Sequence, residues 1–231
     1  MEMRRGVFYG VGIGPGDPEL LTLKALRTLE RCPVLAAPRT GSGEMLALEI
    51  VRQALALTDK TVLPLRFTMS RDPAVLRESH LGAAAEIEAH LAAGRDVAML
   101  NLGDVSIYAT YGYLMDILAA RGYETVMVPG VPSFCAVAAR LGTSLTAADA
   151  PLHILPGGSG ELDRLLELPG AKVLMKSGSK ISRAAEALRQ RGLTGKAAMV
   201  QDCGLPTERV CRDLEQLPRD TGYFATIIVK E

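Results

Sequence analysis

The chain has 231 residues, and 26 lysines and arginines balance 26 aspartates and glutamates, so the formal net charge is zero. This balance gives no positive field over the whole molecule and argues against a nucleic-acid partner, because nucleic acids are bound chiefly through clustered basic residues. The length suffices for one large α/β core or for two cores of roughly 100 residues each.

The apolar segments and the cysteines favour a soluble protein without a structural metal or disulfides. No uncharged run approaches the length of a membrane-spanning helix, and Met1–Arg5 leads into an apolar strand without a signal-type apolar region. The four cysteines lack metal-ligand spacing and lie in mainly apolar runs: Cys32, Cys135, Cys203 and Cys211. We therefore expect a cytoplasmic protein with buried cysteines, no metal and no membrane partner.

The first half of the chain alternates short apolar runs with longer amphipathic ones. Strands are predicted at 6–13, 34–37, 61–67, 96–102 and 125–130. Helices are predicted at 22–32, 44–55, 73–94 and 106–122. Pro33 ends the first of these helices, and Gly94 and Gly122 close the last two. Alternating strands and helices are typical of a mostly parallel sheet that helices cover on its faces.

The pattern changes past residue 128. Four strands are predicted there, at 152–158, 172–177, 196–202 and 222–230. Only two clear helices lie between them, Glu161–Leu168 and Ile181–Arg191. This change predicts two α/β domains, 1–127 with a mostly parallel sheet and 128–231 with a mixed sheet. A cleft between two such domains is a natural place for a ligand.

The loop after the first strand, in the stretch YGVGIGPGDPELLTLKA, has glycines at alternate positions, Gly12, Gly14 and Gly16. It does not fit the phosphate-binding pattern GxxxxGK[ST]. It also fails the dinucleotide fingerprint, because the third glycine comes one residue early and the second strand ends in Pro38 and Arg39 without an acid. Taken alone, the stretch is equally typical of a tight turn that needs glycine for backbone reasons.

Three stretches in order along the chain carry a resemblance to a known family: VGIGPGDPELLTLKA, LGDVSIYATYGYL and VPGVPSFCAVAARLG. Together they resemble the tetrapyrrole methylases, which methylate cobalamin and sirohaem precursors. FTMSRD, SIYATYGYL and PGVPSFCAVAARLG are most similar to its C20-methyltransferases. The resemblance implies two α/β domains with the active site in the cleft between them, S-adenosyl-L-methionine as methyl donor, precorrin-2 or cobalt-factor II as substrate, and a homodimer.

The resemblance also implies which residues contact the methyl donor, through the main chain or through small side chains. They are Pro15, Gly103, Asp104, Ile107, Pro132, Ser133 and Met175. Asp104 would offer an acceptor to the ammonium group of the donor, and an N-cap on the helix starting near Ser106 is the alternative. Val105 stands where the family usually has proline, so the resemblance is weaker at this turn.

On the substrate side, the resemblance places Gly14 beside the macrocycle, whose carboxylates need local cations. Four basic residues at strand ends or loops are candidates, with solvated surface charge as the alternative: Arg39, Arg66, Arg71 and Lys176. Tyr108 and Tyr111, three apart and therefore on one face of the predicted helix 106–122, are candidate catalytic residues that line the macrocycle or help remove the C20 proton. Packing in the core is the alternative for both. Asp17 and Pro18 are predicted to cap a short helical turn.

Transfer of a methyl group from a sulfonium is an in-line displacement that depends mainly on alignment in a dry site. The lack of a Ser-His-Asp or Cys-His arrangement therefore agrees with this chemistry. Two other functions stay open. Methylases of the same fold act on other ring carbons, on RNA or on a modified histidine, and the chain is alternatively a non-catalytic binding module that regulates a partner.

Overall fold

The computed structural model describes residues 4–70, 72–216, 222 and 224–230. They form two compact units, Met1–Pro132 and Ser133–Glu231, which we call the first and second units. Each has its own sheet and helices, so the predicted α/β class is confirmed. The sequence predicted the division after residue 127, whereas the structure groups 128–132 with the first unit, where Val128 pairs with Val11.

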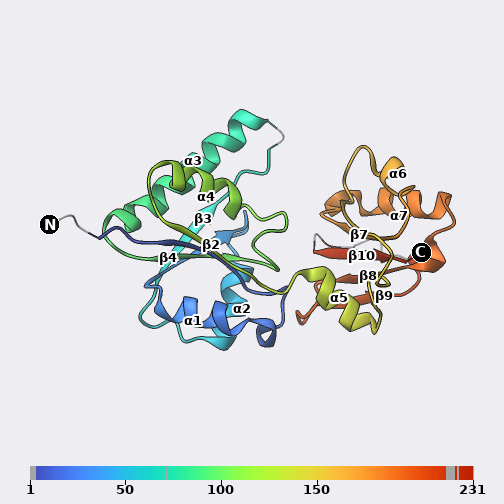
Figure 1. Ribbon diagram of the computed structural model, residues 1–231, viewed down its shortest axis with the longest axis horizontal. Coiled ribbons are helices and arrows are strands. Elements are labelled where there is room, and N and C mark those ends of the chain that lie inside the picture. Colours follow the sequence, from blue (N-terminus) through green and yellow to red (C-terminus); the bar gives the residue numbers. More distant parts are fainter. Residues whose placement is uncertain (1–3, 71, 217–221, 223, 231) are drawn as a thin grey trace. The chain divides into compact units, whose positions relative to one another are not determined.

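The first unit is built on a five-stranded sheet of order β3-β2-β4-β1-β5, and all neighbouring strands are parallel, as predicted. The strands are β1 Phe8–Gly12, β2 Val34–Arg39, β3 Thr61–Arg66, β4 Val97–Asn101 and β5 Thr125–Val128. The helices are α1 Leu23–Arg31, α2 Leu46–Ala54, α3 Pro73–Ala92 and α4 Tyr111–Ala120. Figure 1 shows α1 and α2 on one face of this sheet and α3 and α4 on the other.

Local side chains fix the beginnings of several helices in the first unit. Asp17 accepts a hydrogen bond from the Glu19 N–H at 2.9 Å ahead of a short 3₁₀ turn, which confirms the predicted cap. Asp72 accepts one from the Ala74 N–H at 2.8 Å at the start of α3. Capping of this kind satisfies backbone donors that have no partner inside the helix. These helix starts are therefore encoded locally.

Helix α4 begins at Tyr111, five residues later than the sequence predicted. Residues 105–110 form turns and bends instead. Tyr108 has a φ of 51°, in the left-handed region that a helix of L-residues does not tolerate. Tyr108 and Tyr111 therefore do not share a helical face, and that prediction is wrong.

The second unit has a five-stranded sheet of order β6-β7-β10-β8-β9, which is mixed, as predicted: β6 and β7 are parallel, and the other neighbouring strands are antiparallel. Its strands are β6 Leu152–Pro156, β7 Ala171–Met175, β8 Ala197–Gln201, β9 Arg209–Cys211 and β10 Ala225–Val229. Its helices are α5 Ser133–Leu141, α6 Leu162–Leu165 and α7 Ile181–Gln190. In Figure 1, α6 and α7 lie on one face of this sheet and α5 on the other. The short strand β9 was not predicted, and α6 is shorter than predicted.

The described residues show no helix long and apolar enough to cross a membrane, and no cluster of three potential metal-ligating side chains. All four cysteines have free thiols. Only Cys32 is buried as expected. Cys135 is exposed, because α5 turns its neighbours Phe134 and Ala136 toward the core and leaves Cys135 on the outer face.

Candidate functional site

Three loops meet at the carboxyl-terminal edge of the first sheet, where open α/β sheets bind their ligands. The loops after β1 and β4 are joined by backbone hydrogen bonds. The Ile13 N–H donates to the Asn101 carbonyl at 3.0 Å, and the Gly103 N–H donates to the Gly14 carbonyl at 2.8 Å. Gly14 and Gly103 thereby form an isolated antiparallel bridge. Two of the three stretches that carried the family resemblance are thus in contact.

Glycine is required at this junction because the backbones approach too closely for any side chain. A Cβ on Gly130, in the loop after β5, would lie 2.4 Å from the Gly103 carbonyl oxygen. A Cβ on Gly12 would lie 2.6 Å from the Gly130 nitrogen. Gly14 and Gly103 also have φ values of 78° and 73°, which L side chains rarely adopt. Gly12 and Gly130 therefore serve close backbone packing at the carboxyl ends of β1, β4 and β5, and Gly14 and Gly103 serve the turns beside it through their positive φ values.

Asp104 links two of these loops through its carboxylate. Its Oδ1 accepts from the Ser106 N–H at 2.8 Å and from the Ser106 hydroxyl, and its Oδ2 accepts from the Gly130 N–H at 2.8 Å. Partial burial acts to raise the pKa of Asp104, but these hydrogen bonds outweigh it and hold the pKa below its ordinary value. Asp104 does not cap α4, which begins later, at Tyr111. It fixes the turn at Ser106 and fastens that turn to Gly130.

The two candidate tyrosines have different surroundings. Tyr111 is fully buried, and its hydroxyl shares its one proton between the carbonyls of Phe8 at 3.2 Å and Val126 at 3.1 Å. Burial raises the pKa of Tyr111 to about 12. The ring also packs on Phe8 at a centroid distance of 4.8 Å. Tyr111 therefore belongs to the core, the alternative that the sequence left open, and the catalytic assignment does not fit it.

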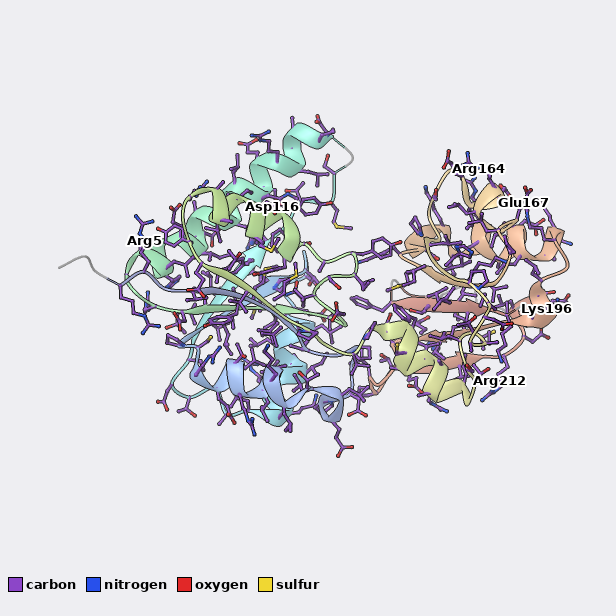
Figure 2. The ribbon with its side chains drawn as sticks, in the orientation of Figure 1. Arg5, Asp116, Arg164, Glu167, Lys196 and Arg212 are labelled. Atoms are coloured by element: carbon purple, nitrogen blue, oxygen red, sulfur yellow. The ribbon has the colours of Figure 1, made fainter. Side chains whose placement is uncertain are left out.

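Tyr108, in contrast, is 44% exposed and lies on the wall of a depression of about 440 Å³. Burial of part of its ring raises the pKa of the phenol, so the hydroxyl is neutral at physiological pH. The depression is formed by the loop after β4, the first turns of α4 and β5: Val105, Ser106, Tyr108, Ala109, Thr110, Gly112, Tyr113, Asp116 and Met127. Figure 2 labels Asp116, which α4 contributes to this wall.

Two of the four candidate cations stand side by side on the first sheet. Arg39 ends β2, Arg66 ends β3, and the parallel register pairs them directly. The Arg39 Nε is buried and has no hydrogen-bond partner among the described residues. Lys176 follows β7 in the second unit, and Arg71 lies outside the described residues.

The second unit has its own group of polar residues at strand ends. Lys176 directly follows β7 and Asp202 directly follows β8, and both have left-handed φ values, 55° and 50°. Such backbone strain in non-glycine residues is typical of functional sites. Asp202 is not among the site residues predicted from the sequence. Its signal was weak, a lone acid before Cys203 and Gly204 at the end of a predicted strand.

Contacts within the second unit organise this edge. The Asp202 Oδ2 accepts from the Gln201 amide at 3.1 Å and from the Thr207 hydroxyl at 3.0 Å. Ser133, the first residue of α5, has its hydroxyl 3.3 Å from that of Thr226, which is buried on β10. Figure 2 labels four other charged residues of this unit: Arg164, Glu167, Lys196 and Arg212.

The structure therefore divides the predicted site residues between two groups. Those on the loops and strand ends of the first unit are Gly14, Pro15, Arg39, Arg66, Gly103, Asp104, Ile107, Tyr108 and Pro132. Those of the second unit are Ser133, Met175 and Lys176. Ile107 and Met175 are half-buried, and Met175 is the last residue of β7.

Several known proteins are similar to this chain. CobIJ, a cobalamin biosynthesis protein of Mycobacterium tuberculosis, is 37% identical over 230 residues, which cover 96% of this chain and 45% of CobIJ. The cobalt-precorrin-2 C(20)-methyltransferase of Salmonella typhimurium is 33% identical over 98% of this chain and 97% of its own length. The precorrin-2 C(20)-methyltransferase of a Sinorhizobium species is 32% identical over 97% and 95%. The chain thus spans about half of the mycobacterial relative.

A solved structure and a family comparison agree with these likenesses. The uroporphyrin-III C-methyl transferase of Thermus thermophilus, solved in complex with S-adenyl homocysteine, superposes with a TM-score of 0.70 at 25% identity, covering 98% of each chain. Residues 7–218 match the family described as Tetrapyrrole (Corrin/Porphyrin) Methylases. The chain that builds this glycine junction therefore belongs to the tetrapyrrole methylase family.

Proposed function

We propose that the protein is an S-adenosyl-L-methionine-dependent methyltransferase that methylates C20 of a cobalamin precursor, precorrin-2 or cobalt-factor II. The observation that carries the proposal is the junction of Gly12, Gly103 and Gly130, whose side-chain-free backbones are held together beside Asp104. Relatives named for C20 methylation align over nearly their whole length, which supports this choice of ring carbon.

The residues of the first unit fit a cationic methyl donor. Gly103 and Pro15 offer backbone surface without bulky side chains, and Asp104 is ionised at neutral pH because its pKa is lowered. A fixed negative charge favours the positive sulfonium and ammonium groups of S-adenosyl-L-methionine. We further propose that Ile107, Pro132, Ser133 and Met175 complete the donor contacts, and that Gly14 contacts the macrocycle.

In the reaction, the nucleophilic C20 carbon attacks the methyl group as the bond between that methyl and the sulfonium sulfur breaks. S-adenosylhomocysteine leaves, and the proton on C20 then passes to solvent water. We assign Tyr108 the role of contacting the macrocycle as a neutral phenol, since its raised pKa keeps the hydroxyl protonated and leaves no phenolate to take up a proton. Alignment of this kind removes roughly 7 to 11 kcal/mol of a barrier.

We expect the purified protein to bind S-adenosylhomocysteine and not NAD or ATP. The glycine loop fits neither nucleotide motif, and Gly12 and Gly14 are explained by close backbone packing and by a positive φ. Isothermal titration calorimetry with the three ligands tests this expectation. Binding of NAD without binding of S-adenosylhomocysteine would contradict the donor assignment.

We also expect one new methyl group, at C20, when the protein is incubated with donor and either precorrin-2 or cobalt-factor II. Mass spectrometry detects the added methyl, and NMR with a ¹³C-labelled donor methyl locates it. A product methylated at a pyrrole carbon would support the second candidate, a methylase that acts elsewhere on the ring. Donor binding without turnover of either substrate would support a regulatory module. Homodimerisation and a cytoplasmic location stay predictions from the family resemblance.

A further inference from the structure

Two arginines at the carboxyl-terminal edge of the first sheet form a pair that the fold does not neutralise. Arg39 and Arg66 are register partners at the ends of β2 and β3, so both side chains leave the same face of the sheet. Neither forms an ion pair with any described residue. Adjacent like charges repel, which disfavours this arrangement unless an anion joins them.

Arg39 differs from Arg66 because one nitrogen of its guanidinium group is buried. Its Nε is inaccessible to water and has no hydrogen-bond partner among the described residues. A buried donor without a partner is costly, and each such group needs an explanation. The acid in the following loop, Glu44, accepts a hydrogen bond from the Ser42 hydroxyl at 3.2 Å. Arg39 as a whole is half-buried, so an external carboxylate can still reach the outer nitrogens of its guanidinium group.

We infer that Arg39 and Arg66 clamp two neighbouring carboxylates of the macrocycle and thereby set which ring edge faces the donor. The inference rests on the proposed function and deepens it, because it assigns the binding of substrate carboxylates to these two arginines among the basic residues. Arginine suits the task, since its planar guanidinium donates two parallel hydrogen bonds to one carboxylate. Two carboxylates, one for each arginine, also relieve the repulsion between the two guanidinium groups.

The position of the pair on the sheet agrees with this assignment. In the order β3-β2-β4-β1-β5, a single strand, β4, separates β2 from β1. Neighbouring strands are about 4.8 Å apart, so the end of β2 lies roughly 10 Å from the end of β1 and its glycine loop. A ring lying beside Gly14 would therefore extend its carboxylated substituents toward Arg39 and Arg66 along one edge of one sheet.

Binding of uroporphyrin III, a stable macrocycle with eight carboxylates, tests the clamp through the fluorescence of the porphyrin. Arg39→Gln and Arg66→Gln are each expected to weaken binding about tenfold, the usual effect of losing a hydrogen bond to a charged group. The double variant is expected to bind more weakly than either single variant, because each arginine holds its own carboxylate. Arg39→Lys, which keeps the charge without the planar fork, should lose an intermediate amount.

Arg52→Gln is the matched control, because Arg52 is an exposed arginine of the same unit that pairs with Glu49 at 2.8 Å. It should leave porphyrin binding unchanged, and all variants should bind S-adenosylhomocysteine like the unaltered protein. Equal porphyrin affinity in Arg39→Gln, Arg66→Gln and Arg52→Gln would overturn the clamp while the proposed function stands. A double variant no weaker than the single variants would overturn the assignment of two carboxylates. If the unaltered protein bound neither uroporphyrin III nor S-adenosylhomocysteine, the proposed function and the clamp would both be overturned.

Discussion

Replacing Gly130 with alanine is expected to abolish donor binding and to lower the free energy of unfolding by about 3 kcal/mol. The new Cβ would lie 2.4 Å from the Gly103 carbonyl oxygen and 2.6 Å from the Gly12 carbonyl carbon. Both contacts are with backbone atoms, which have no rotamer to relieve the overlap. The loop after β5 must therefore move away from the loops after β1 and β4. Calorimetric unfolding and titration with S-adenosylhomocysteine measure the two effects.

Gly82→Ala provides the control for this substitution. Gly82 lies inside α3, and a Cβ there has no heavy atom within 4 Å. Alanine in an open helix position stabilises a protein by roughly 0.5 to 1 kcal/mol. The control should therefore unfold at the same or a higher temperature and keep its donor affinity. A Gly130→Ala protein with normal donor affinity would show that the junction does not form the donor site.

Asp104→Asn is expected to weaken donor binding at least tenfold and to lower the free energy of unfolding by about 1.5 to 3 kcal/mol. The asparagine oxygen can still accept a hydrogen bond from Ser106. Its amide NH₂ group, however, is a donor that would face the Gly130 N–H, which is also a donor, so the hydrogen bond to Gly130 is lost. The substitution also removes the negative charge proposed to favour the cationic donor. Titration calorimetry with S-adenosyl-L-methionine and thermal unfolding measure the two losses.

The loss of stability in Asp104→Asn should depend on pH in a definite direction. The native pKa of Asp104 is lowered, so its carboxylate stabilises the fold fully above the unfolded value of about 3.9 and loses that contribution as the pH falls through the native pKa. The difference in free energy of unfolding between the unaltered protein and Asp104→Asn should therefore be constant between about pH 6 and 8, where the carboxylate does not titrate. It should shrink as the pH falls into the acid range.

Asp72→Asn is the matched control for Asp104→Asn. Asp72 makes the capping hydrogen bond to the Ala74 N–H at the start of α3. Asparagine caps helices about as well as aspartate, so stability and donor binding should both be nearly unchanged. An Asp104→Asn protein that is less stable but binds donor normally would restrict Asp104 to fastening the loops.

The sequence by itself determined the local elements and the family. Apolar periodicity located the five parallel strands of the first unit, because a buried strand and an amphipathic helix carry patterns that are readable over a few residues. The cap at Asp17 was predicted for the same reason, since its hydrogen bond to Glu19 spans two residues. Periodicity gave a wrong start for α4, because the left-handed turn at Tyr108 has no apolar pattern of its own.

Only the tertiary structure decided how the site residues meet. Strand order places β4 between β2 and β1, and no local pattern encodes that order. The hydrogen bond from Gly130 to Asp104 and the register of Arg39 with Arg66 follow from it. Burial of Tyr111 beneath the strands likewise assigned it to the core and left Tyr108 at the surface. These contacts join residues far apart in the chain, and their geometry is set by the packing of the whole sheet.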